Sequence, residues 1–142
     1  MLHRGTHAGM PFAVAMGLRV LDYVEHNPQM FVAMDRKAKE LADALRHVLG
    51  SLALDYAVVQ LESIVDFKFR PGPPTRSYDD QQRDDQRAYA AFYHAMRENG
   101  VLLPPSHNEV MFLSSAHGEH EIALTIDAIF KSLHALHSAG VV

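Results

Sequence analysis

Cysteine is absent from the 142 residues of this chain. Its absence excludes disulfide bonds, thiolate catalysis and zinc sites built from cysteine. Long hydrophobic runs are absent too: the apolar stretch over residues 10–18 ends at Arg19 and is far shorter than the roughly 20 residues of a membrane-spanning helix. No run of lysine or arginine exceeds two residues, so nothing indicates a nucleic-acid surface. We therefore expect no membrane and no nucleic-acid partner, and the cytoplasm as the location.

Common catalytic motifs are also missing. The chain holds no G-x-S-x-G serine-hydrolase motif and no Walker phosphate loop. Ten histidines suggest a metal site, and two pairs at i,i+3 spacing stand at residues 117/120 and 134/137. Neither pair forms the H-E-x-x-H pattern, and histidines near helix ends are explained by the helix dipole and solvent. We predict no metal site.

The lysines show no sign of a Schiff-base nucleophile. Such a lysine is activated by desolvation or by a second cation. The contexts of all four lysines are helical or alternating strand patterns that favour solvent exposure, at Lys37, Lys39, Lys68 and Lys131.

The composition is that of a globular domain of ordinary size. Hydrophobic residues make up 48% and charged residues 21% of the chain, with a net charge of -4. Periodicity and turn residues then predict the order ααββαββα. The expected elements are helices over 11–26 and 28–50, strands over 56–60 and 64–70, a helix ending at 99–100, short strands over 101–103 and 110–113, and a last helix over about 119–136. The predicted fold class is α+β, a small antiparallel sheet with helices packed on it.

The stretch GTHAGMPF at residues 5–12 is the first candidate site. Gly5 lets the backbone approach a ligand closely. Backbone N–H groups and the Thr6 hydroxyl suit a phosphate oxygen. The alternative interpretation is a plain turn before the helix that Pro11 opens.

The stretch LLPPSHNEVMFLSSAH at residues 102–117 is the second candidate site. Glu109 follows two prolines and precedes an apolar run, so its carboxylate is expected at the edge of the sheet. There it could act as an acid or base, or steer a protonated amine. The alternative is a solvated loop glutamate.

Taken together, the two stretches resemble a known family. GTHAGMPFAVAMGL is similar to the G-T-x-S-G-N-P-x-A-x-A-A-G-L segment of class III pyridoxal-phosphate aminotransferases. LLPPSHNEVMFLSSAH is similar to the L-P-P-S-x-x-E-x-x-F-x-S-x-A-H segment of glutamate-1-semialdehyde 2,1-aminomutases. TRSYDDQQRDDQRAYAAFYHAM resembles the stretch between them in that family. The departures are Ala8 and Met10 in place of Ser and Asn, and Glu62 in place of a Gly.

The resemblance implies the C-terminal small domain of a fold-type I enzyme. Residues 1–26 would form a helix linking to a large domain missing from this chain, and 27–142 the small domain. In the family, the Gly-Thr step matching Gly5 and Thr6 binds the cofactor phosphate, with the Thr reaching across a dimer interface. The Glu matching Glu109 sits near the cofactor in the active site.

The same resemblance implies that the catalytic residues are divided between two domains. The Schiff-base Lys of the family lies in the large domain, upstream of the Gly-Thr motif. We therefore expect pyridoxal 5'-phosphate in the parent enzyme but none on this chain alone, which would lack transaminase activity. The expected partners are a second copy, forming a dimer, and the large catalytic domain. The alternative is a stand-alone protein-interaction domain that reuses the fold.

The first helix carries apolar residues around most of its circumference. A single small layer cannot cover so many of them. We predict that the isolated chain self-associates and buries Phe12, Val14, Leu18 and Leu21.

Overall fold

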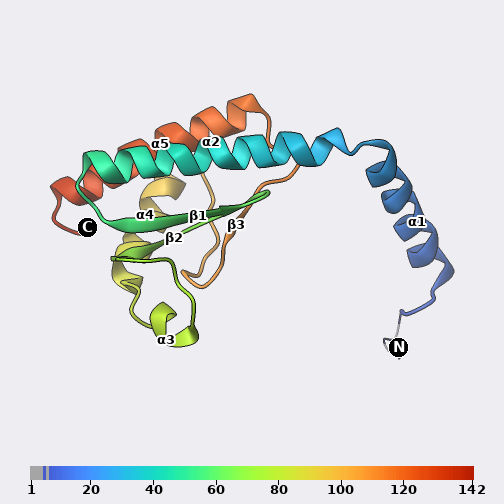
Figure 1. The fold of residues 1–142 in the computed structure, drawn as a ribbon, viewed down its shortest axis with the longest axis horizontal. Coiled ribbons are helices and arrows are strands. Elements are labelled where there is room, and N and C mark those ends of the chain that lie inside the picture. Colours follow the sequence, from blue (N-terminus) through green and yellow to red (C-terminus); the bar gives the residue numbers. More distant parts are fainter. Residues whose placement is uncertain (1–4, 6) are drawn as a thin grey trace.

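The computed structural model describes residue 5 and residues 7–142. Figure 1 shows a long helix lying over a small sheet, with a first helix projecting from one end. The elements in chain order are α1 (Pro11–His26), α2 (Gln29–Ser51), β1 (Tyr56–Leu61), β2 (Ile64–Pro71), α3 (Tyr78–Gln81), α4 (Gln86–Glu98), β3 (Met111–Phe112) and α5 (Glu119–Ser138).

The sheet has three strands in the order β1-β2-β3, and both neighbouring pairs are antiparallel. The hairpin between β1 and β2 turns at Glu62 and Ser63, with Leu61 opposite Ile64. Glu62 has φ 50°, a left-handed conformation that Gly adopts more readily than Glu. The position where the family resemblance puts Gly is therefore one where Gly would be relaxed.

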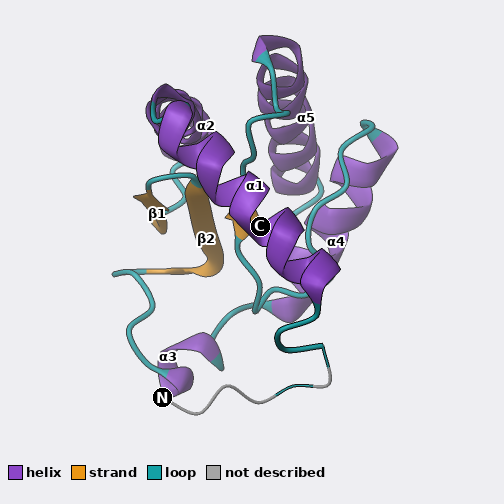
Figure 2. Ribbon diagram, turned by 90° about the vertical axis from the view of Figure 1, so that its right-hand side faces the viewer, coloured by secondary structure: helices purple, strands orange, loops and turns teal. Residues whose placement is uncertain are grey.

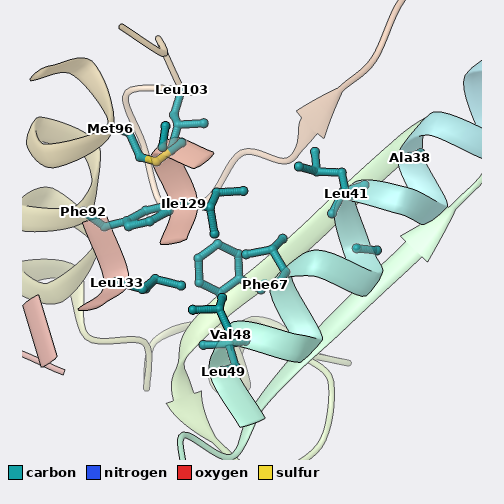
Figure 3. Close-up of a cluster of buried hydrophobic side chains, with 14 of the residues drawn as sticks. Ala38, Leu41, Val48, Leu49, Phe67, Phe92, Met96, Leu103, Ile129 and Leu133 are labelled. Carbon is teal, nitrogen blue, oxygen red and sulfur yellow. The ribbon is translucent and has the colours of Figure 1, made fainter. Parts of the chain in front are cut away.

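The core lies between one face of β2 and the helices α2, α4 and α5, which Figure 2 shows grouped to one side of the strands. Alternate residues of β2 point into it, because successive side chains of a strand face opposite ways. Val65, Phe67 and Phe69 are buried there. Figure 3 shows Phe67 among side chains from all three helices. The labelled members are Ala38, Leu41, Val48, Leu49, Phe67, Phe92, Met96, Leu103, Ile129 and Leu133.

Local signals explain where these helices begin and end. The Asp85 carboxylate accepts the N–H groups of Arg87 and Ala88 at the start of α4, as an N-cap residue does. Glu121 accepts the N–H of Gly118 at 2.8 Å at the start of α5, the half of a capping box that needs no cap side chain. Helix α2 ends at Ser51, and Ala53 just beyond its C-cap residue has φ 55°, a position where Gly is the usual residue.

Helix α1 stands apart from the rest of the chain (Figure 1), and none of its residues is buried. Met10 precedes it without a side-chain cap, as expected from the loss of the family's Asn. Its large apolar side chains face solvent, with Phe12 70% and Leu21 66% exposed. No helix in the described part of the chain is long and apolar enough to span a bilayer.

The predicted α+β class is confirmed, but two details differ. The expected strand over 101–103 was wrong: residues 101–104 form no strand. The N–H of Val101 instead bonds to the carbonyl of Met96, closing the end of α4, and Pro104 has no N–H to offer a sheet. The segment after β2, for which the sequence predicted no helix before the one ending at 99–100, contains the short helix α3, capped by the Ser77 side chain. The division into 1–26 and 27–142 stays a prediction.

Candidate functional site

Glu109 lies in a tight loop over residues 104–109, between α4 and β3. Its side chain is exposed. The N–H of Glu109 donates to the Ser106 carbonyl at 3.1 Å, and the N–H of Asn108 donates to the Ser106 hydroxyl at 3.2 Å. Ser106 therefore holds the backbone on which the Glu109 carboxylate is presented.

Two side chains from other elements fasten this loop. The Tyr89 hydroxyl, on α4, donates to the Pro104 carbonyl at 2.5 Å. The Lys68 ammonium, on β2, donates to the His107 carbonyl at 2.6 Å. The loop is thus attached on both sides of Ser106.

The pKa of the Tyr89 phenol is raised by its surroundings, which include Glu109. Burial is the main cause that raises the pKa of the Tyr89 phenol to about 12, and the negative charges of Glu109 and Asp66 raise it further. Burial and nearby carboxylates both disfavour a phenolate. The negative charge of Glu109 thus contributes, after burial, to keeping the Tyr89 phenol protonated.

Charged side chains gather on the face of β2 that points away from the core. Asp66 Oδ1 lies 3.0 Å from Lys68 Nζ, and these side chains are 22% and 11% exposed. Burial is the main cause that raises the pKa of the Asp66 carboxyl, and Lys68 opposes it. The exposure predicted for Lys68 was wrong: its strand alternates, but the loop over residues 104–109 packs on the part of the outer face where Lys68 lies.

Asp84 is the most deeply buried member of this charged cluster, with 2% of its side chain exposed. Its Oδ1 lies 3.7 Å from Nε of Arg70, and its Oδ2 lies 3.5 Å from Nδ1 of His107. No hydrogen bond reaches either oxygen from the described residues. Two cationic or basic groups therefore flank a carboxylate that sits beneath the loop.

A hollow of about 210 Å³ opens on the same outer face of the sheet. Its wall combines the charged residues of β2 with apolar residues of β1 and the loop after β2. The lining includes Ala57, Val59, Leu61, Ile64, Asp66, Lys68, Arg70, Pro73, Pro74, Thr75 and Val110. Arg70 is tied to this loop, since it donates to the Pro73 carbonyl at 2.8 Å and to the Thr75 hydroxyl at 3.2 Å.

The other predicted site residues lie at the opposite end of the chain. The Gly5 carbonyl accepts the N–H of Ala8 at 3.0 Å, in a turn that leads into α1. Thr6 lies outside the described residues. Because α1 projects from the rest of the molecule (Figure 1), Gly5 and Glu109 belong to separate parts of it.

The contacts of the four lysine amines bear on the prediction that none of them forms a Schiff base. All four lysines lie within the described residues, and each is engaged elsewhere. Lys37 donates to the His117 carbonyl at 2.6 Å and Lys68 to that of His107. Lys39 pairs with Asp43, and Lys131 with Asp127. Lys68 is the one that borders the hollow and is largely desolvated, but its amine is held by the His107 carbonyl and by Asp66.

Sequence reasoning missed that Tyr89 and Asp84 contact the Glu109 loop, at Pro104 and at His107. Asp84 and Asp85 both look like helix-start residues, yet only Asp85 caps α4 while Asp84 turns inward. The alternation Asp66, Lys68, Arg70 was the only available signal, because it places three charges on one face of a strand.

The chain is similar to proteins named glutamate-1-semialdehyde 2,1-aminomutase. It is 33% identical over 129 residues to the one from Thermus thermophilus and 35% identical over 133 residues to the one from Methanosarcina acetivorans. Each comparison covers 91% of this chain and 30% of the relative. The chain thus spans about a third of the length of these relatives. No family model matches it.

The fold has a counterpart among solved structures. A structure described as a transaminase with PLP bound aligns with a TM-score of 0.76 at 24% identity, over 100% of this chain and 31% of that one. The similarity predicted from the two motifs is therefore confirmed: this chain is homologous to part of the aminomutases, and its α+β fold occurs in part of a transaminase.

Proposed function

We propose that this homologue of glutamate-1-semialdehyde 2,1-aminomutases supplies the C-terminal domain of a pyridoxal-phosphate enzyme that transfers amino groups. The observation that carries the proposal is the similarity to the aminomutases along 91% of the chain. The match of the whole chain to one part of a transaminase fold supports it.

In this assembly the cofactor, when bound, would act as an electron sink for bonds broken next to the substrate nitrogen. The lysine that anchors it would come from a large domain, since the four lysines here are engaged elsewhere. Glu109 would stand at the pocket wall and hold a protonated amine or a proton at its carboxylate. Gly5 and Thr6 would bind the cofactor phosphate, with Thr6 serving a neighbouring subunit.

The exposed helix α1 gives the proposed assembly a contact surface. Its apolar side chains, including Phe12 and Leu18, are 70% and 62% exposed. Exposed apolar area of this extent is typical of a surface that another protein covers. We propose that α1 packs against the large domain and a second copy in a homodimer, and that the enzyme works in the cytoplasm.

Complementation tests the proposal. A curated relative is produced without the segment that this chain matches, and the chain is added in trans or joined to it. We expect the visible absorbance of bound pyridoxal phosphate and aminomutase or transaminase turnover to return only with the chain. Glu109→Gln should lower kcat while the cofactor absorbance stays. Glu98→Gln, an exposed glutamate on α4, is the matched control and should change neither.

Two results would contradict the proposal. One is a stoichiometric, site-specific lysine adduct with turnover after the chain alone is treated with pyridoxal phosphate and borohydride. The other is a chain that shows no affinity for the truncated relative at high micromolar concentration, which would favour a stand-alone interaction domain.

A further inference from the structure

Buried charge on the outer face of the sheet requires an explanation. Desolvating a charged side chain costs free energy unless partners replace its water. The core lies on the opposite face and is complete without these groups. Yet the side chains of Lys68 and Arg70 are each only 11% exposed, and that of Asp84 only 2%.

Lys68 and Asp84 of this cluster contact the loop over residues 104–109, whereas Arg70 is tied to the loop after β2. Lys68 donates to the His107 carbonyl, and Asp84 lies 3.5 Å from the His107 ring. Tyr89 donates to the Pro104 carbonyl, and its ring meets that of His107 edge to face at 6.4 Å. Side chains from β2, from α4 and from the turn before α4 thus contact one short loop.

The contacts to the loop restrain the backbone at Glu109 as well. Lys68 fixes the carbonyl of His107, and Ser106 beside it accepts the N–H groups of Asn108 and Glu109. Prolines at the start of the loop restrict its backbone further. The outer attachments therefore limit where the Glu109 side chain can point.

We propose that Lys68 and Tyr89 are positioning residues for Glu109, acting through the backbone of the loop over residues 104–109. The inference rests on the proposed role of Glu109 and adds what sets its geometry. The free-energy cost of desolvating these charged groups is offset in function if the reaction rate depends on precise placement of the Glu109 carboxylate.

The first test measures the loop in the chain itself, without cofactor. In Lys68→Met, we expect the Glu109 amide to exchange its hydrogen faster by roughly tenfold or more. The Ile129 amide in α5 reports the core and should keep its rate. Lys131→Met removes an exposed lysine, 60% exposed in its pair with Asp127, and should leave both rates unchanged.

Lys68→Met leaves the half-buried Asp66 carboxylate without its partner, which could destabilise the fold. A second variant controls for this effect. Asp66→Asn combined with Lys68→Met removes the stranded charge while the anchor stays absent. If the core amides are intact in either variant and the Glu109 amide keeps its wild-type rate, the anchoring role is wrong.

A second test uses the Tyr89 phenol as a probe of Glu109, by NMR titration of labelled tyrosine. Loss of a nearby cation by itself raises the pKa of a phenol or leaves it unchanged. Movement of the Glu109 carboxylate away lowers the pKa of Tyr89. We therefore expect Lys68→Met to lower this pKa, Lys68→Arg to restore it, and Lys68→Met to lower it much less in a Glu109→Gln background. A Lys68→Met change in the Tyr89 pKa that is the same with Glu109 and with Glu109→Gln would overturn the inference.

The complementation assay separates this inference from the proposed function. If Glu109→Gln leaves turnover unchanged, the proposed role of Glu109 fails whatever the loop does. If Glu109→Gln lowers kcat but Lys68→Met loosens the loop without lowering it, the positioning role alone fails. The expected result is a lower kcat in both single variants and little further loss in the double variant, because both act through one carboxylate.

Discussion

The stability of this chain at high pH should depend on Tyr89. The folded structure raises the pKa of its phenol from 10.0 to about 12, with burial as the largest cause. An unfolded phenol ionises near pH 10. Below pH 10 the phenol is protonated in both states, so its contribution to stability is complete. As the pH rises from 10 toward 12 the unfolded state ionises first, and the contribution is lost.

The magnitude follows from the size of that change. A difference of two pH units corresponds to at most about 2.7 kcal/mol, at 1.36 kcal/mol per unit. The ring is only partly buried, so solvent screening reduces this to about 1 kcal/mol. Tyr89→Phe also removes the hydrogen bond to the Pro104 carbonyl, which costs about 1 kcal/mol at neutral pH.

The assay is urea unfolding followed by circular dichroism at several pH values between 7 and 12. We expect Tyr89→Phe to be less stable than the wild type at pH 7, with the difference shrinking above pH 10. Tyr78→Phe changes a ring that is 74% exposed and should parallel the wild type throughout. A constant difference between Tyr89→Phe and the wild type from pH 7 to 12 would refute the reasoning.

The remaining predictions concern the core, a helix end and α1. Phe92 is 1% exposed and meets Phe67 edge to face at 5.4 Å, so Phe92→Ala should lower the free energy of unfolding by about 3–5 kcal/mol in urea melts. Phe112→Ala, at a ring 68% exposed, is the control and should cost under about 0.5 kcal/mol. Ala53→Gly should raise the melting midpoint, because a left-handed conformation costs alanine about 1 kcal/mol; a lower midpoint would contradict this. Leu18→Glu should weaken self-association in sedimentation velocity with no change in unfolding, and a monomeric wild type at high micromolar concentration would count against the role of α1.

Local chemistry was enough to predict most of the framework. Pro11 predicts the start of α1, and Asn99-Gly100 predicts the end of α4, because these residues act on the few dihedrals beside them. The strand predicted over 64–70 is present as β2, and its apolar residues Val65, Phe67 and Phe69 alternate with charged ones and face the core, since strand period is a property of the chain itself. The similarity to the aminomutase family was also predicted from the sequence, on the motifs at residues 5–18 and 102–117, and the comparisons confirm it.

Other features depended on what lies beside a residue in space. Alternation places Lys68 on the outer face of β2, but only the loop over residues 104–109, from 36 or more positions later in the chain, buries it. Asp84 and Asp85 are adjacent and chemically identical, yet one caps a helix and the other lies under a loop. The Val101 N–H, which a strand would have used for pairing, donates instead to the Met96 carbonyl at the end of α4. Sequence by itself determined most of the elements and the candidate carboxylate at Glu109. Tertiary structure alone decided which charged side chains lose their water and contact the loop that carries this carboxylate, because desolvation is set by neighbours distant along the chain.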